Sequence, residues 1–217
     1  MVNESQLVEV IKQAKESDKD RKFKQSVEMI MVFKDVDVKK GFAINETVQL
    51  PKKTTKPASV CIMASGDMGI KAKNAKADMV MDENELTKLS ADKKKAKKLI
   101  NDYDFFLADT KLMPAVGKKL GQLLGPRGKM PTPVPFNAPI ESFLERFRSS
   151  VKIRAKGSLS MSCRIGEENM DDADLAANAS AVATAVEKTL PNGSKNIEKI
   201  MFKTTMGKAI KVEQVKK

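Results

Sequence analysis

Residues Ser59–Ala64 read SVCIMA, a short and almost continuous apolar run. A second run of this kind, FFLA, follows at Phe105–Ala108. Strands buried on both faces of a parallel sheet have this character, whereas strands with one face in water alternate apolar and polar residues. Apolar residues recur at helical spacing at 71–77, 85–89, 93–101, 113–120 and 140–147, and a brief apolar run lies at 78–81. Strands that alternate with helices predict a doubly wound parallel α/β unit of Rossmann-like type.

The two ends of the chain share a different pattern. Residues Ser26–Lys34 alternate, with Val27, Met29, Met31 and Phe33 on one face of a predicted strand. We also expect a helix at 5–16, a long alanine-rich helix at 174–190, and strands at 47–50, 151–154, 158–163, 197–204 and 208–212. Strands followed by a helix and more strands predict an α+β domain.

Residues Pro51–Pro57, PKKTTKP, are polar with a proline at each end, and they form the first candidate hinge. We therefore predict a fold of mixed class, α+β and α/β. One discontinuous domain is formed by 1–53 and 151–217, and it encloses an inserted Rossmann-like domain at 54–150. The excess positive charge is divided equally between the two domains.

The bulk composition indicates the class of partner. The 217 residues carry a net charge of +12, which predicts a polyanionic partner, nucleic acid before acidic membrane. No apolar run approaches the roughly 18 residues that span a bilayer, and the N-terminal segment lacks the apolar core of a signal peptide. We therefore expect a cytoplasmic protein that does not enter a membrane.

Missing residue types exclude several classes of active site. The sequence has no histidine, which removes Ser-His-Asp triads, Cys-His pairs and nearly all zinc hydrolases. Cys61 and Cys163 form no CxxC motif, so we expect neither a disulfide framework nor a metal site. Ser65–Gly69, SGDMG, has the spacing of a plain strand-to-helix turn, and no phosphate-binding glycine motif occurs elsewhere. The sequence thus predicts no cofactor and no enzyme.

The stretch Leu123–Pro133, LLGPRGKMPTP, predicts a stiff and basic surface loop. Its glycines permit unusual backbone torsions, while each proline fixes φ and removes a hydrogen-bond donor. Such a loop is either a rigid connection or a displayed shape that a partner uses.

Three polar motifs each have a structural and a functional interpretation. Lys93–Lys98, KKKAKK, is either a solvated helix face or a sequence-independent phosphate contact. Thr204–Gly207, TTMG, is either a strand-end turn or a set of hydroxyls, apolar cover and close backbone approach for folded RNA. Acidic residues that precede the alanine-rich helix are predicted to stabilise its N-terminus: Glu167, Glu168, Asp171, Asp172 and Asp174.

Four motifs together resemble the ribosomal protein L1 family of the large subunit. They are LGPRGKMP at 124–131, TTMG at 204–207, RKF at 21–23 followed by SVE at 26–28, and KKLG at 118–121. They occur in order over essentially the whole chain. The lack of histidine and the short segment 155–162 resemble the archaeal branch of this family more than the bacterial branch.

The resemblance implies an elongated two-domain protein with a hinge, whose terminal split β-α-β domain binds large-subunit ribosomal RNA and forms the mobile stalk at the exit site. Carried over by motif, the RNA-binding residues are Lys22, Phe23, Ser26, Glu28, Thr204, Thr205, Met206 and Gly207, with Arg154, Lys156 and Lys199 on neighbouring strands. The resemblance also implies a secondary RNA contact at Arg127 and Lys129 of the glycine-proline loop, with tRNA or a further RNA segment as the partner.

The resemblance also implies functions beyond a structural role. These are help in releasing deacylated tRNA from the exit site, and repression of translation through binding to the leader of the protein's own messenger RNA. We expect a monomer when the protein is free of the ribosome. Two other functions stay open from the residues alone: a nucleotide- or phosphate-dependent transferase built on the α/β domain, and a nonspecific basic chaperone or DNA-coating protein.

Overall fold

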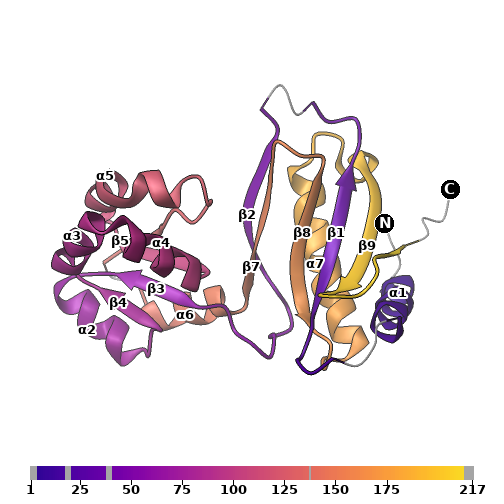
Figure 1. Ribbon diagram of the computed structural model, residues 1–217, viewed down its shortest axis with the longest axis horizontal. Coiled ribbons are helices and arrows are strands. Elements are labelled where there is room, and N and C mark those ends of the chain that lie inside the picture. The colour runs from indigo at the N-terminus through magenta and orange to yellow at the C-terminus, as the bar shows by residue number, and fades with distance from the viewer. Residues whose placement is uncertain (1–3, 18–20, 38–40, 137, 213–217) are drawn as a thin grey trace. The chain divides into compact units, whose positions relative to one another are not determined.

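The computed structural model describes residues 4–17, 21–37, 41–136 and 138–212, and these form two compact units (Figure 1). The terminal unit contains residues 1–56 and 149–217, and the central unit contains residues 57–148. Both crossings of the chain lie within three residues of the positions that the sequence suggested. Within the described residues, no helix combines the length and the apolar character that a membrane span requires.

The terminal unit is an α+β structure. Its helices and strands are α1 (Glu4–Glu16), β1 (Ser26–Phe33), β2 (Ala43–Gln49), β7 (Ser150–Lys156), β8 (Ser160–Glu167), α7 (Asp172–Thr189), η2 (Gly193–Asn196), β9 (Ile197–Thr204) and β10 (Ile210–Lys211). Four strands form an antiparallel sheet in the order β10-β9-β1-β8, and β2 pairs with β7 in a separate two-stranded ribbon.

Strand β1 lies inside the four-stranded sheet and confirms the face that the sequence predicted. Val27, Met29, Met31 and Phe33 are buried, and the residues between them are half-buried. The buried side chains pack against α1 and α7 in one apolar core. Because this alternation gives the sheet one dry face, both helices lie on the same side of it (Figure 1).

The central unit is a parallel α/β structure. Its helices and strands are β3 (Val60–Met63), α2 (Gly66–Asn74), β4 (Met79–Met81), α3 (Glu83–Ala91), α4 (Lys93–Asp102), β5 (Phe105–Asp109), α5 (Met113–Leu124), β6 (Thr132–Val134) and α6 (Ile140–Arg148). The strand order is β4-β3-β5-β6, and every pairing in this sheet is parallel.

Helices cover both faces of the parallel sheet, as a doubly wound unit requires. One core packs α2 and α6 against the sheet, around Ile62 and Leu107. The other packs α3, α4 and α5 against the opposite face, around Met63 and Phe106. Neighbouring strand residues point to opposite faces, so both faces need apolar side chains. The continuous runs SVCIMA and FFLA have this composition, and the predicted fold class is confirmed.

Several element boundaries differ from the sequence prediction, and three of the differences bear on the fold. Helix α2 begins at Gly66, earlier than the predicted 71–77, and its Gly69 passes close to the end of β3: a Cβ there would lie 3.1 Å from the carbonyl oxygen of Ala64. Strand β2 begins at Ala43, and only its Ile44 is buried, so its alternation is too weak to read. Strand β6 begins inside the predicted loop and ends one residue beyond it, and its Pro133 is tolerated because β6 is an edge strand.

The acidic residues before α7 do more than stabilise its N-terminus. Asp171 occupies the N-cap position without a side-chain capping hydrogen bond. Asp172 forms an ion pair with Lys15 of α1, and Asp174 forms one with Lys52 at 2.9 Å. These carboxylates therefore join segments that are distant in the sequence.

The polar segment that follows Leu50 is held by the terminal unit. Asn178 is fully buried in α7, accepts a hydrogen bond from the backbone N–H of Lys52 at 2.9 Å and donates to the backbone oxygens of Lys52 and Ile165. Glu167 accepts hydrogen bonds from the backbone N–H groups of Thr55 and Lys56 at 2.8 and 3.4 Å. The hinge predicted at 51–57 is therefore fixed to the terminal unit over most of its length.

Candidate nucleic-acid interface

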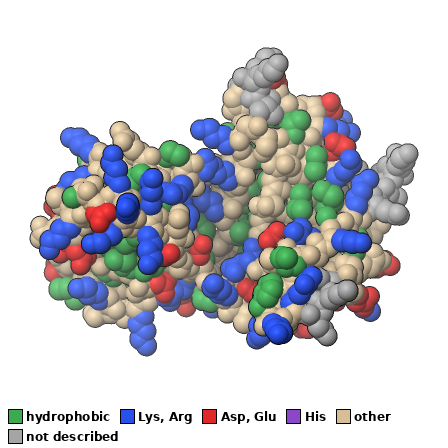
Figure 2. Space-filling model, viewed as in Figure 1, with side chains coloured by type: hydrophobic (Ala, Val, Ile, Leu, Met, Phe, Trp, Pro, Cys, Tyr) green, Lys and Arg blue, Asp and Glu red, His purple; other side chains and the backbone are tan. Residues whose placement is uncertain are grey.

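The four-stranded sheet of the terminal unit has one face without helices, which we call the open face. It carries the half-buried residues of β1 and their neighbours in register on β8, β9 and β10. These residues are Glu28, Ile30 and Val32 of β1, Ser160, Ser162 and Arg164 of β8, Lys199, Met201 and Lys203 of β9, and Lys211 of β10. Figure 2 shows hydrophobic side chains over β1 and β9, with Lys and Arg side chains around them.

The open face combines an apolar centre with a mostly cationic surround. Ile30 of β1 lies in register with Met201 of β9. Glu28 lies between Lys203 on one side and Arg164 on the other. A surface with several cations, one carboxylate and partly exposed apolar groups suits a folded RNA, which offers phosphates, sugar hydroxyls and base edges together.

The TTMG turn is tied to the start of β1 at one end of the open face. The Thr205 hydroxyl accepts a hydrogen bond from the backbone N–H of Ser26 at 3.1 Å and lies 3.4 Å from the Ser26 carbonyl oxygen. Lys203 donates to the Thr205 carbonyl at 3.1 Å. The Thr205 hydroxyl is thus used within the protein, where it fixes the turn against Ser26.

Gln25 is a residue that sequence reasoning missed. Its side chain is buried and accepts a hydrogen bond from the backbone N–H of Met206 at 3.0 Å. Its backbone oxygen accepts another from the N–H of Glu168. A single polar residue between two motifs gives no sequence signal, because its role depends on a partner 181 positions away.

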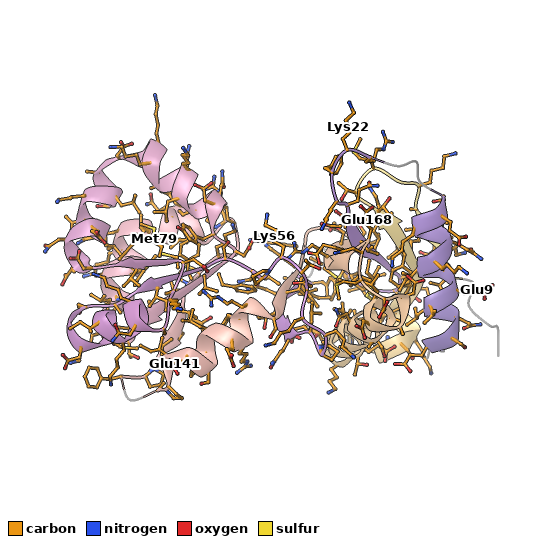
Figure 3. All side chains as sticks on the ribbon, turned by 90° about the horizontal axis from the view of Figure 1, so that it is seen from below. Glu9, Lys22, Lys56, Met79, Glu141 and Glu168 are labelled. Atoms are coloured by element: carbon orange, nitrogen blue, oxygen red, sulfur yellow. The ribbon has the colours of Figure 1, made fainter. Side chains whose placement is uncertain are left out.

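Two large apolar side chains project into solvent near these contacts, one from the segment before β1 and one from the TTMG turn. Phe23 is 52% exposed and Met206 is 60% exposed. Lys22 is also exposed, and Figure 3 shows it standing away from the body of the unit. Gly207 closes the turn, with its N–H donating to the Thr204 carbonyl at 3.2 Å. The structure therefore brings the RKF, SVE and TTMG motifs together at one site.

Thr204 differs from its neighbours in the motif. It lies opposite Val27 on the core side of the sheet, and only 1% of its surface is exposed. Its side chain is therefore not displayed to a partner, in contrast to the sequence prediction. Strand alternation explains this, because Thr204 and Thr205 must point in opposite directions.

The other predicted cations lie on separate strands of the terminal unit. Arg154 and Lys156 lie on β7, and their alternation with the buried Ile153 and Ala155 directs them away from the core. Strand β7 lies beside β8 (Figure 1). Lys199 lies on the open face and forms an ion pair with Glu198 at 3.0 Å.

The glycine-proline loop belongs to the central unit, and its two cations differ. Gly128 has φ of +68°, a left-handed conformation that favours glycine, and its N–H donates to the Gly125 carbonyl at 2.9 Å. The ammonium group of Lys129 donates to the carbonyl oxygens of Ile100 and Tyr103 at 2.8 and 2.6 Å, and partial burial lowers its pKa. Lys129 is thus a structural anchor, and its predicted contact with RNA conflicts with this role.

We also searched the described part of the chain for metal sites and for reactive cysteines. No cluster of three or more metal-ligating side chains occurs there. Cys61 and Cys163 are buried, and burial raises the pKa of each thiol to about 12. A buried thiol with such a pKa is protonated at neutral pH and is a poor nucleophile.

Comparison with known proteins gives a consistent set of matches. The model of the ribosomal protein L1p/L10e family matches residues 11–208. A large ribosomal subunit protein uL1 of Cenarchaeum symbiosum is 68% identical over 211 residues, 97% of this chain and 97% of that protein. Proteins of the same name from Thermofilum pendens and Archaeoglobus fulgidus are 49% and 41% identical, over 99% and 98% of this chain and 96% and 99% of their own lengths.

Proposed function

The chain belongs to the ribosomal protein L1p/L10e family, and from this premise we propose that its terminal unit binds a folded segment of large-subunit ribosomal RNA through the open face and the TTMG turn. Members of this family are structural constituents of the large ribosomal subunit and not enzymes. The archaeal relatives agree with the branch that the sequence resembles.

One observation carries this proposal. Three motifs that lie up to about 180 positions apart meet where the Thr205 hydroxyl contacts Ser26 and the Gln25 side chain holds Met206. The fixed turn presents Phe23 and Met206 to solvent beside exposed cations. Apolar side chains in solvent cost free energy unless a partner covers them, and unpaired RNA bases are suited to do so.

The test is a pair of matched phenylalanine variants in the full chain, with binding to a large-subunit ribosomal RNA segment as readout. Phe23→Ala should weaken binding by about 1–3 kcal/mol, the range for loss of one base-stacking aromatic group. Phe136→Ala removes a similarly exposed phenylalanine from the central unit and should leave the affinity unchanged. Equal affinities of the two variants would remove Phe23, and the site it forms with the TTMG turn, from the proposal.

The central unit is proposed to act on tRNA. In ribosomes, the protein would form the mobile stalk at the exit site, where Arg127 of the glycine-proline loop contacts deacylated tRNA and aids its release. Arg127 is half-buried beside Lys129, which ties the loop to α4. Ribosomes that carry Arg127→Gln should release deacylated tRNA more slowly than unmodified ribosomes, and an unchanged release rate would contradict this role.

We further propose that the same open face binds the leader of the protein's own messenger RNA and represses its translation. A surface of this kind reads a local RNA shape, so a transcript with the same local shape competes for it. Competition binding with both RNAs should show mutual exclusion. A complex that holds both RNAs at once, or a leader-bearing reporter indifferent to added protein, would exclude this function.

A further inference from the structure

Helix α4 of the central unit carries an unusual concentration of lysines. Lys93, Lys94, Lys95, Lys97 and Lys98 are all exposed, and the helix packs on the unit through Ala96 and Ile100. Helical spacing places Lys94, Lys97 and Lys98 on one outward ridge, which we call the lysine ridge. Figure 2 shows Lys and Arg side chains gathered over the region of the central unit where α4 and α5 lie.

This arrangement opposes the stability of the helix that bears it. The positive end of the helix dipole lies at the N-terminus, where acidic residues are favourable and cations are unfavourable. The first turn of α4 has no acidic residue, and Lys93–Lys97 and Lys94–Lys98 are like-charge pairs four residues apart. Asp92 offsets part of this cost by accepting hydrogen bonds from the N–H groups of Lys94 and Lys95, which lower its pKa.

Little of the charge on the ridge is neutralised within the unit. Lys95 forms an ion pair with Asp92 at 3.7 Å, and its side chain is 80% exposed. Among the described residues, the ion pairs found for α4 involve none of the three ridge lysines. The carboxylates at the far end of the helix are Asp102 and Asp104.

The ridge adjoins the glycine-proline loop along one helix. Lys129 of that loop is bound to the carbonyl oxygens of Ile100 and Tyr103 at the C-terminal end of α4. A helix of 10 residues is about 15 Å long, so the lysines and the end of α4 that holds the loop lie within roughly that distance of each other. This distance spans several phosphates of a nucleic-acid duplex.

We propose that the lysine ridge is a second RNA contact, which holds the phosphate backbone of double-helical RNA without reading its sequence; the choice of RNA as the polyanion rests on the proposed function. The exposed side of α4 offers cations and no exposed aromatic side chain on which an unpaired base would stack. Backbone contact is therefore the mode of recognition that its chemistry supports.

The test compares two triple variants of the full chain. The ridge variant carries Lys94→Gln, Lys97→Gln and Lys98→Gln. The control carries Lys71→Gln, Lys73→Gln and Lys76→Gln, which remove the same charge from α2 and the residues just after it. The probe is an RNA duplex of about 16 base pairs, unrelated to ribosomal sequence and titrated at several salt concentrations.

The ridge variant should bind the duplex about tenfold more weakly at low salt, and the slope of log affinity against log salt should fall by about 2 to 3, since each lost phosphate contact contributes about 0.9. The control should stay within about twofold of the unmodified chain. The melting temperature of the ridge variant should be equal or higher, because its helix loses unfavourable charges.

Several results would overturn the proposal. Equal losses of duplex affinity in both variants would mean that net charge alone governs binding. An unchanged duplex affinity of the ridge variant would mean that the ridge does not contact the duplex. If the ridge variant retained duplex binding but bound anionic lipid vesicles more weakly than the unmodified chain, the ridge would be assigned to a membrane surface instead. Failure of the ridge proposal is distinguished from failure of the proposed function by Phe23→Ala. This variant should weaken binding to the ribosomal RNA segment and leave duplex binding by the ridge intact.

Discussion

The terminal and central units carry similar charge but cover their sheets differently. In the terminal unit, α1 and α7 pack on one side of an antiparallel sheet and leave the open face to solvent. In the central unit, helices cover both faces of a parallel sheet. A sheet with a free face can present side chains from several strands to one partner. A covered sheet can meet a partner only through its outer helices and loops.

This difference assigns different kinds of recognition to the two units. The open face combines cations, one carboxylate and apolar groups next to the TTMG turn, a mixture that suits the selective recognition of one folded RNA that we propose. The central unit presents lysines of α4 and the Arg127 loop, whose chemistry favours phosphates in general. We infer that specificity lies in the terminal unit and electrostatic support in the central unit.

The largest expected effect tests whether the units fold independently. Leu107→Ala opens a cavity beneath the central sheet and Met29→Ala opens one beneath the terminal sheet, and each should cost its own unit about 2–5 kcal/mol of unfolding free energy. Each unit contains one buried thiol, Cys61 in the central unit and Cys163 in the terminal unit, and burial raises the pKa of each to about 12. Such a thiol reacts with a thiol reagent only when its unit opens. Urea titration with thiol labelling therefore reads the two units separately.

Leu107→Ala should lower the urea midpoint for labelling of Cys61 alone, and Met29→Ala that of Cys163 alone. If either variant moves both midpoints by the same amount, the chain unfolds as one cooperative unit, and the comparison between two independent units is wrong.

A smaller effect tests how the linker is held. Asn178→Leu keeps the approximate side-chain volume but leaves one N–H and two carbonyl groups without their partner. The terminal unit should lose about 1–3 kcal/mol of stability, and the midpoint for Cys61 in the central unit should not change. Asn101→Leu, at an exposed position of α4, is the control and should have little effect on either thiol. A stable Asn178→Leu protein would mean that segment 52–56 is not anchored by this side chain.

The elements of the fold were largely predictable because their signals are local. The alternation of β1 and the continuous runs of β3 and β5 each reflect which faces are buried, and burial determines composition directly. Strand β6 was missed because it has three residues, one of them Pro133, and it forms only through pairing with β5.

The site was predictable by motif but not in its internal contacts. Thr205 was expected to offer its hydroxyl to RNA, yet that hydroxyl contacts Ser26. Gln25 binds Met206, and Asn178 binds Lys52, each more than 100 positions away, so nothing in their sequence neighbourhood marks these contacts. Lys129 looked like a displayed cation, and only the fold shows that its ammonium group is held by two carbonyls.

The smallest effect tests a single apolar side chain. Met206→Asp places a negative charge on the exposed turn of the terminal unit and should weaken binding to the ribosomal RNA segment about tenfold, or roughly 1.4 kcal/mol. Met130→Asp makes the same change at an exposed methionine of the central unit and should change this binding by less than about twofold. Circular dichroism should show both variants folded. Similar losses in the two variants would mean that only net charge matters.

The central claim is tested most directly by measuring the affinity of each unit alone for the same large-subunit ribosomal RNA segment. Residues 1–56 joined to 149–217 by a short Gly/Ser linker should bind within about tenfold of the full chain, a difference of roughly 1.4 kcal/mol. Residues 57–148 should bind this RNA far more weakly and with the same affinity as an unrelated RNA. Tighter binding by the isolated central unit would contradict the account and reverse the roles of the two units.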